Sequence, residues 1–366
     1  MERVTIELSS ERARRVRWHA QLLGGSDLTP TEVVERAVAL QGQDLPAVLR
    51  AIAIRSAPGT TVADVTAAFD RGELVRSWPM RGTLFATTPT LLAAILAHSA
   101  ERTHRSTATR RAALHIDDAV LDRARGVLNE ALSERMLTRT DALAALEAAG
   151  VATGAGRGYH LLMHFAVDGL HHWGPFDESG TEQLLVRTPQ RSDSDDLPEL
   201  SDLLSGVILA RGPITEDDLA WWTKLPKGAI RPALPAIPEL VAVTVEGRPA
   251  LTIGEPPLAL PPTGVTLVPG FDEWILGYAD RTLVATPAAF DALVPGGNGV
   301  FRPAVLVDGR VVGSWRVPIR AGRPLDPVVD IVERVSAADR RRIDAALAAW
   351  PHARPAAPVA LARVGS

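Results

Sequence analysis

The sequence predicts a mainly α-helical protein of the α+β class, in which small β-hairpins follow groups of short helices. Three observations lead to this prediction. Helix-capping signals recur along the first two thirds of the chain, and at three places two short β-prone segments come after them. A Pro-rich segment at 254–264 then separates this part from a chain end that is richer in strands.

Helices followed by a β-hairpin are the element order of a winged helix. This order recurs three times at irregular spacing, which favours a structural repeat without a repeated sequence. We therefore expect three tandem winged-helix units over residues 1–115, 116–195 and 196–256. A β-rich domain that ends in a helix is expected over 257–366.

In the first unit the clearest signal is Thr29-Pro30-Thr31-Glu32, a capping box with proline at the first helical position. Asp44, and then Thr61 with Asp64, are expected to cap the two helices that follow. The elements of this unit are expected as helices over residues 10–24, 30–40, 45–56, 61–71 and 89–110, and as strands over 74–78 and 83–87.

The later units repeat the same order. In the third unit, Thr215 and Asp218 cap a helix that follows Gly212-Pro213. Helices are expected over residues 117–135, 140–149, 157–167, 199–211, 216–224 and 226–235, and strands over 170–173, 182–187, 240–245 and 249–253.

In the C-terminal domain, Asp308-Gly309 has the composition of a tight hairpin turn. Strands are expected over residues 265–269, 274–276, 281–285, 300–301, 304–307 and 310–317, and a last helix over 337–350.

Composition places the chain among packed globular proteins, with 366 residues of which 46% are hydrophobic. The lack of cysteine excludes disulfides and thiolate metal sites and fits a reducing cytoplasm. The N-terminus has no signal-peptide pattern and no apolar run reaches about 18 residues, so we expect a soluble cytoplasmic protein. The net charge of −4 is uneven, at +2 over 1–160, −11 over 161–300 and +5 over 301–366, so both ends would attract a polyanion.

The link between two predicted helices, Gln41-Gly42-Gln43, is the main candidate functional motif. On extended backbone, side chains two positions apart point to the same side, and the glycine leaves the space between them open. Each amide both donates and accepts hydrogen bonds, so the pair could hold a water molecule against a substrate group. The alternative is that each glutamine is solvated or caps a neighbouring carbonyl.

Several other groups have both a functional and a structural interpretation. Candidate DNA-binding arginines, which could equally be solvated, are Arg81, Arg102, Arg105, Arg110, Arg302 and Arg316. Asp272-Glu273 could be a catalytic acid pair, but we favour a structural role, because acids at turns often cap backbone or pair with arginine, for which Arg281, Arg302 and Arg316 are available.

No metal ion or cofactor is predicted. His160 and His164 have the i, i+4 spacing of metal ligands, but no third ligand is evident in the sequence. Neither a phosphate-binding loop nor a dinucleotide glycine fingerprint is present.

The chain contains several short motifs that are separated by longer stretches of sequence. They are Gln41-Gly42-Gln43, Pro79–Leu84, Pro269–Glu273, Gly277–Arg281, Phe301-Arg302-Pro303 and Gly313–Arg316. In these motifs, and over nearly its whole length, the sequence resembles the winged-helix DNA glycosylase superfamily of AlkZ and YcaQ. The resemblance implies three tandem winged helices arranged as a C around a DNA-sized channel, with a C-terminal β domain.

The same resemblance implies a catalytic Gln-apolar-Gln signature, which Gln41 and Gln43 match. Gly42 departs from the larger apolar residue of the family, and Asp44 lies outside the second catalytic position, so no catalytic role is transferred to it. The implied activity is hydrolysis of the N-glycosidic bond of cationic N7-alkylpurines. Bulky adducts or interstrand crosslinks are the implied lesions, as in enzymes of self-resistance to DNA-alkylating antibiotics.

The expected partner is double-stranded DNA that carries alkylated purines, bound by a monomer away from any membrane. Lyase activity is not expected, because no lysine lies near the glutamine pair to form a Schiff base. The alternative function is a non-catalytic winged-helix regulator or damage sensor, and a catalytically silent relative is a third possibility because of Gly42.

Overall fold

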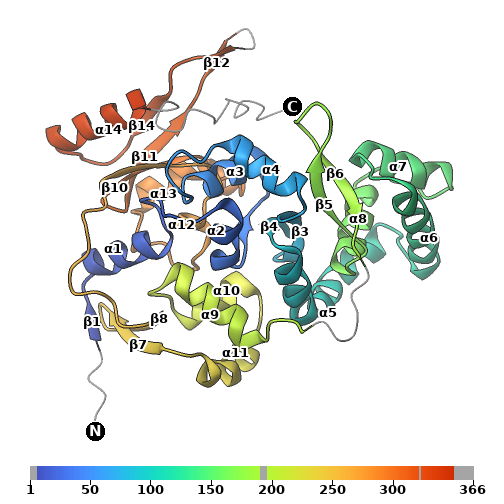
Figure 1. Ribbon diagram of the computed structural model, residues 1–366, viewed down its shortest axis with the longest axis horizontal. Coiled ribbons are helices and arrows are strands. Elements are labelled where there is room, and N and C mark those ends of the chain that lie inside the picture. The colour runs from blue at the N-terminus through green and yellow to red at the C-terminus, as the bar shows by residue number, and fades with distance from the viewer. Residues whose placement is uncertain (1–5, 190–195, 321–322, 350–366) are drawn as a thin grey trace. The chain divides into compact units, whose positions relative to one another are not determined.

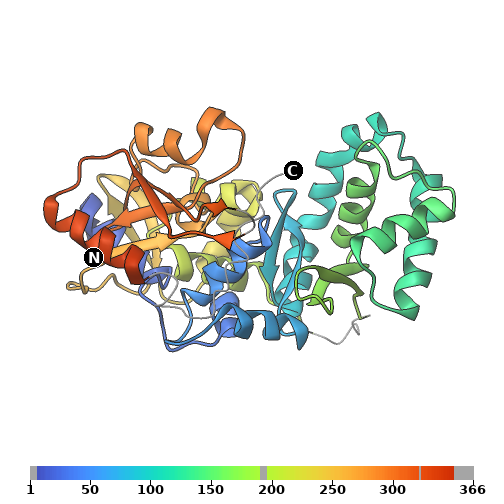
Figure 2. The same ribbon diagram turned by 90° about the horizontal axis from the view of Figure 1, so that it is seen from above.

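The computed structural model describes residues 6–189, 196–320 and 323–349 (Figures 1 and 2). By its contacts the chain divides into two compact units. The first contains residues 1–65 and 201–366, and the second contains residues 66–200. No helix within the described residues is both long and apolar enough to cross a bilayer. The α+β class is confirmed, because helices predominate and the sheets are small.

The first unit begins with helices that carry the predicted caps. Its first elements are β1 (Ile6–Leu8), α1 (Ser10–Ala20), α2 (Pro30–Ala37), β2 (Leu40–Gln41) and α3 (Leu45–Ala53). The Thr29 capping box is present, and Asp44 accepts a hydrogen bond from the Ala47 N–H at 2.9 Å. Helix α2 ends three residues earlier than expected because Val38 adopts a left-handed φ of 67°.

The next part of this unit follows the predicted order of helices and a hairpin. It contains α9 (Leu200–Arg211), α10 (Glu216–Thr223), α11 (Lys227–Ala233), η1 (Leu234–Ala236), β7 (Leu240–Val245) and β8 (Arg248–Ile253). Strand β1, which the sequence does not predict, pairs in parallel with β7 and gives a sheet of order β1-β7-β8. The division of the chain into winged helices stays a prediction.

The C-terminal sheet has the antiparallel order β14-β11-β10-β9. Its strands are β9 (Val265–Val268), β10 (Ala304–Val307), β11 (Arg310–Arg316) and β14 (Val328–Ile331), beside a short pair, β12 (Ile319–Arg320) with β13 (Arg323–Pro324). Ala304 and Leu306 of β10 face one core and Val305 and Val307 face the other, as alternation along a strand requires. The first core also contains α13 (Pro287–Leu293), and the second contains Ile343 of α14 (Ala337–Ala349).

The strands expected over 274–276, 281–285 and 300–301 are wrong. Residues Glu273–Leu276 form the short helix α12, because the Asp272 carboxylate caps it by accepting the Trp274 N–H at 2.9 Å. Residues 281–285 form a turn before α13, which Thr286 caps with Pro287 at its first position. A 3-10 turn, η2 (Pro295–Gly297), follows α13, and the Asp308-Gly309 hairpin is confirmed.

The second unit is entered through α4 (Val62–Asp70). Its further elements are β3 (Val75–Met80), β4 (Thr83–Thr87), α5 (Pro89–Ala113), α6 (Asp118–Glu134), α7 (Arg139–Ala148), α8 (Arg157–Val167), β5 (His171–Phe176) and β6 (Gln183–Arg187). The two predicted hairpins join through β3 and β5, so these four strands are ordered β4-β3-β5-β6. Trp78, Trp173 and Phe165 lie in one core between this sheet and the helices.

Candidate active site

The glutamine motif lies in the short link between α2 and α3, as predicted. Gln41 ends β2 and is only 6% exposed, whereas Gln43 is exposed just before the N-cap of α3. Gly42 between them is buried. The two amides therefore differ in their access to water, with Gln43 the more available of the two.

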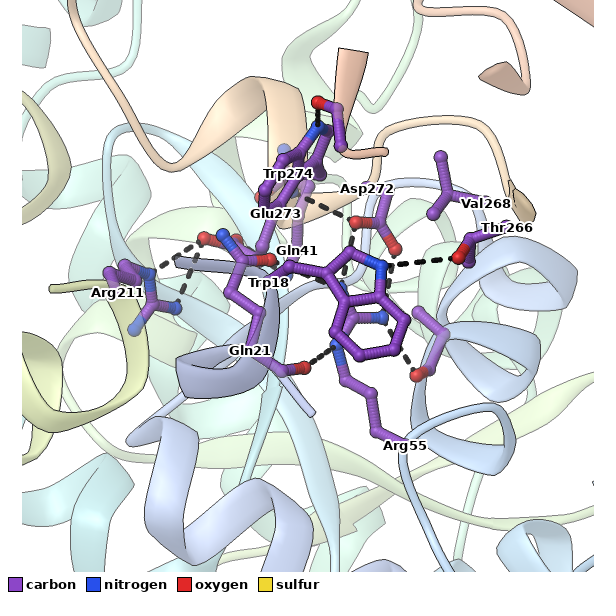
Figure 3. A network of polar contacts seen from close by, with 12 residues as sticks. Trp18, Gln21, Gln41, Arg55, Arg211, Thr266, Val268, Asp272, Glu273 and Trp274 are labelled. Atoms are coloured by element: carbon purple, nitrogen blue, oxygen red, sulfur yellow. Dashed lines mark hydrogen bonds and ion pairs between the residues drawn. The ribbon is translucent and has the colours of Figure 1, made fainter. Parts of the chain in front are cut away.

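A buried ion pair holds the backbone that leads into this motif (Figure 3). Arg211, at the end of α9, donates from Nε to Glu273 Oε2 at 3.0 Å. Its two terminal nitrogens donate to the carbonyls of Ala37 at 2.9 Å and Ala39 at 2.8 Å. Glu273 Oε1 accepts the backbone N–H of Gln41 at 3.1 Å. The pair thus binds the backbone of three alternate residues, Ala37, Ala39 and Gln41. These contacts fix the position of the Gln41 backbone.

Trp222 of α10 completes this pair. Its indole N–H donates to Glu273 Oε2 at 2.8 Å, and the Arg211 guanidinium lies over its ring at 4.2 Å from the centroid. Arg211, Trp222 and Glu273 are between 1% and 3% exposed. A buried ion pair is tolerable only when its remaining polar atoms are also bonded, and both carboxylate oxygens here are. We call Arg211, Trp222 and Glu273 the backbone clamp.

Asp272 forms a second buried pair beside the clamp. Arg55, just after α3, donates from Nη1 and Nη2 to the two Asp272 oxygens at 2.9 and 2.8 Å. The structural interpretation of Asp272-Glu273 therefore agrees with the contacts. The partners are Arg55 and Arg211, however, and not the three arginines closer in the sequence, because α12 packs among helices that come from distant parts of the chain.

Gln21 and Tyr278 connect the two ion pairs. Gln21 accepts from Arg55 Nη2 at 3.2 Å and donates to the Tyr278 hydroxyl at 3.0 Å, which in turn donates to the Arg211 carbonyl at 2.8 Å. Burial raises the pKa of Tyr278, so its hydroxyl stays protonated at neutral pH. The support of the motif is a continuous buried network that runs from α1 to α12.

A small cavity lies against this network, lined in part by Gln21, Arg36, Leu40 and Glu273. Its volume of about 10 Å³ has room for about one water molecule. Pockets for drug-sized ligands are roughly 300 Å³ or more. This cavity therefore cannot hold a purine base, and Gln43 is the glutamine of the motif that is open to solvent.

The candidate arginines are distributed over both units. In the first unit, Arg302 and Arg316 are exposed, and Arg316 ends β11. In the second unit, Arg102, Arg105 and Arg110 are exposed on α5, over an arc of about 140° at 3.6 residues per turn.

Arg81 differs from the other candidate arginines. It lies half-buried in the β3–β4 turn with a left-handed φ of 61°, and its guanidinium is 5.9 Å from the centroid of the Phe85 ring. Its assignment to DNA binding, like that of the other arginines, stays a prediction.

Comparison with known proteins connects this arrangement with DNA glycosylases. A solved structure, Streptomyces sahachiroi DNA glycosylase AlkZ, superposes with a TM-score of 0.77 and 23% identity over 94% of this chain and 96% of that one. A curated relative from the same organism, an interstrand DNA cross-link repair glycosylase, is 37% identical over 83 residues, which are 22% of each chain. The sequence model of the family "DNA glycosylase AlkZ-like" matches residues 34–352. This match covers most of the chain, including the glutamine motif and the backbone clamp, and the chain therefore belongs to the AlkZ-like DNA glycosylase family.

Proposed function

We propose that the protein is a DNA glycosylase that hydrolyses the N-glycosidic bond of cationic N7-alkylated purines. The observation that carries the proposal is the glutamine motif itself, in a member of a glycosylase family and with its backbone held by the buried Arg211–Glu273 pair. Double-stranded DNA is the proposed partner, bound by a monomer. The released products are the free alkylated base and an abasic site.

The proposed chemistry needs little acid or base catalysis. Alkylation at N7 places a positive charge on the purine, so the bond from C1′ to N9 breaks with its electron pair moving to the base, which leaves neutral. A water molecule adds to C1′ and loses a proton to solvent. The enzyme then has to place this water and to align dipoles around the developing sugar cation.

The two glutamines can place the water and align dipoles around the sugar cation. The Gln43 amide is exposed and can hold the attacking water, since it both donates and accepts. Gln41 is buried beside it and can orient that water or face the sugar. Neutral amides do this without a carboxylate that would have to be desolvated at the site.

Glu273 is a poor alternative as a catalytic base. Its Oε1 accepts the Gln41 N–H, and its Oε2 accepts from Arg211 and Trp222. A carboxylate committed to three donors and 3% exposed has no free lone pair aimed at a substrate. We assign Glu273 as a positioning residue, which acts through the backbone of Gln41.

The proposed lesions include bulky adducts and interstrand crosslinks. The curated relative is named for cross-link repair, and a crosslinked base cannot easily be turned into a closed pocket. The cavity behind the motif is too small for any base, which agrees with attack on a lesion that stays in the duplex. Self-resistance to a DNA-alkylating natural product is the corresponding biological role.

The test compares cationic and neutral bases. The full-length protein is incubated with duplexes that carry 7-methylguanine, an N7-guanine crosslink, hypoxanthine or only normal bases. Free base and alkali-labile sites are then measured. Release from the first two duplexes alone is expected. Release of hypoxanthine at a similar rate would contradict the role of substrate charge. Binding to alkylated duplex without release would support the non-catalytic damage sensor instead.

A further inference from the structure

A second group of chemically competent side chains lies in the second unit. His104 comes from α5, and His164 and Asp168 come from the last turn of α8 and its C-cap. One ligand atom from each of the three lies within 4.8 Å of the others. The side chains are 24%, 11% and 18% exposed, so an ion between them would be partly shielded from water.

The sequence alone could not show this group. The i, i+4 spacing in the sequence suggests His160 and His164 as a pair of metal ligands, and the sequence shows no third ligand. In the fold, α5 packs on α8, which brings His104 to His164 with ring centroids 4.4 Å apart. The third ligand is Asp168, one helical turn beyond His164.

Two of the three ligand separations bracket the value expected for a tetrahedral ion site. His104 Nε2 is 2.7 Å from Asp168 Oδ1, and His164 Nε2 is 3.7 Å from Asp168 Oδ2. Ligand atoms at about 2.0–2.1 Å from a tetrahedral zinc ion are about 3.3 Å from one another. Small side-chain adjustments would therefore give three ligands. Imidazole nitrogens with one carboxylate suit Zn²⁺ rather than Mg²⁺ or Ca²⁺.

Arg125 of α6 competes for the same carboxylate. Its Nη2 contacts Asp168 Oδ2, and its guanidinium lies 5.1 Å from the centroid of the Phe165 ring. The Arg125 side chain is 48% exposed, so it can turn toward solvent. Arg111 is a further positive charge that acts on His164. An arriving cation would have to displace Arg125 from Asp168.

We propose that His104, His164 and Asp168 form a three-ligand Zn²⁺ site that joins α5 to α8, with its fourth position open to water. Arg125 occupies the carboxylate in the metal-free protein and lowers the affinity of the site. The proposal concerns residues apart from the glutamine motif and does not depend on the glycosylase activity.

The test titrates the full-length protein with zinc sulfate by calorimetry, with cobalt absorbance as a second readout of tetrahedral coordination. Binding of one Zn²⁺ per chain is expected, with no heat from Mg²⁺. His104→Ala and His164→Ala should weaken binding at least tenfold. His160→Ala is the matched control on the same helix and should bind as the wild type does.

Arg125→Gln keeps all three ligands, so it tests the proposal even where a histidine variant misfolds. It should bind Zn²⁺ several-fold more tightly than the wild type. The proposal is overturned if the wild type binds no Zn²⁺, if both folded histidine variants bind it unchanged, or if Arg125→Gln binds it more weakly.

Discussion

At the residue scale, the clamp connects a buried charge pair with the position of one backbone N–H. Glu273 takes the Gln41 N–H on one oxygen and Arg211 on the other, and Arg211 holds the carbonyls of Ala37 and Ala39. A misplacement of about 1 Å in such a site can cost about 10²-fold in rate. We therefore expect the clamp to contribute to catalysis without touching the substrate.

The variant Glu273→Gln tests this role. It keeps the size of the side chain but leaves the buried Arg211 charge without its counterion. Breaking one side of a buried pair costs about 3–5 kcal/mol, so we expect a clearly lower melting temperature. Release of 7-methylguanine in single-turnover assays should also fall at least tenfold, while duplex binding by the folded fraction is kept.

The double variant Glu273→Gln/Arg211→Gln separates stability from positioning. Removing both charges leaves no uncompensated ion, so much of the melting temperature should return. The rate should stay low, because this variant loses the Arg211 contacts to the carbonyls of Ala37 and Ala39. Recovery of the wild-type rate together with the melting temperature would show that the pair matters only for stability.

At the element scale, α9 packs directly on the strained residue before the motif. A Cβ on Gly206 of α9 would lie 2.5 Å from Val38 Cγ2. Val38 has a φ of 67°, and its branched side chain cannot turn aside cheaply. The close approach of α9 and this segment therefore requires glycine at position 206.

The variant Gly206→Ala should accordingly destabilise the protein and slow base release, although alanine is the better helix former. Gly126→Ala in α6 is the matched control, since nothing lies within 4 Å of the added Cβ. The control should gain up to about 1 kcal/mol from helix propensity. Thermal unfolding and single-turnover rates measure both effects, and a stabilised, fully active Gly206→Ala protein would refute this packing argument.

The buried histidines of β5 predict acid sensitivity of the second unit. Burial lowers the pKa of His171 to about 3 and that of His172 to about 4, against about 6.5 in an unfolded chain. Between these values the unfolded state binds more protons, so stability falls as pH decreases from about 6.5. The melting temperature of His171→Phe should fall less steeply from pH 7 to pH 4.5 than that of the wild type, and parallel slopes would contradict this explanation.

Local signals predict the helices well and the support of the site poorly. The Thr29 and Thr215 boxes and the Asp308-Gly309 turn are each specified within four residues, and all are present. Residues 274–276 look like a strand by composition, but the Asp272 cap makes them helical. Arg55 comes just after an apolar helix and Arg211 ends one, which is a weak sign of a buried charge. Only the tertiary fold shows what these arginines bind.

At the scale of the whole molecule, we expect DNA binding to depend on exposed arginines in a protein of net charge −4. Each arginine that neutralises a phosphate releases counterions and steepens the salt dependence of affinity by about one unit. Arg302 and Arg316 are exposed in the first unit, which also contains the glutamine motif.

The variants Arg302→Ala and Arg316→Ala should therefore each reduce the slope of log affinity against log salt by about one. Arg340→Ala, at an exposed position of α14, is the matched control, and its slope should equal that of the wild type. Fluorescence anisotropy with a labelled duplex at several salt concentrations measures the slopes. Unchanged slopes in the first two variants would remove these arginines from the interface.

The central claim is that two uncharged amides suffice to release a base that is already cationic. Its most direct test is the single-turnover rate of 7-methylguanine release by the wild type, Gln43→Ala and Gln41→Ala/Gln43→Ala, with Glu35→Ala on the exposed face of α2 as control. We predict a loss of about 10²-fold for Gln43→Ala and no detectable release by the double variant, with duplex binding unchanged. Release by the double variant at the wild-type rate would contradict the claim.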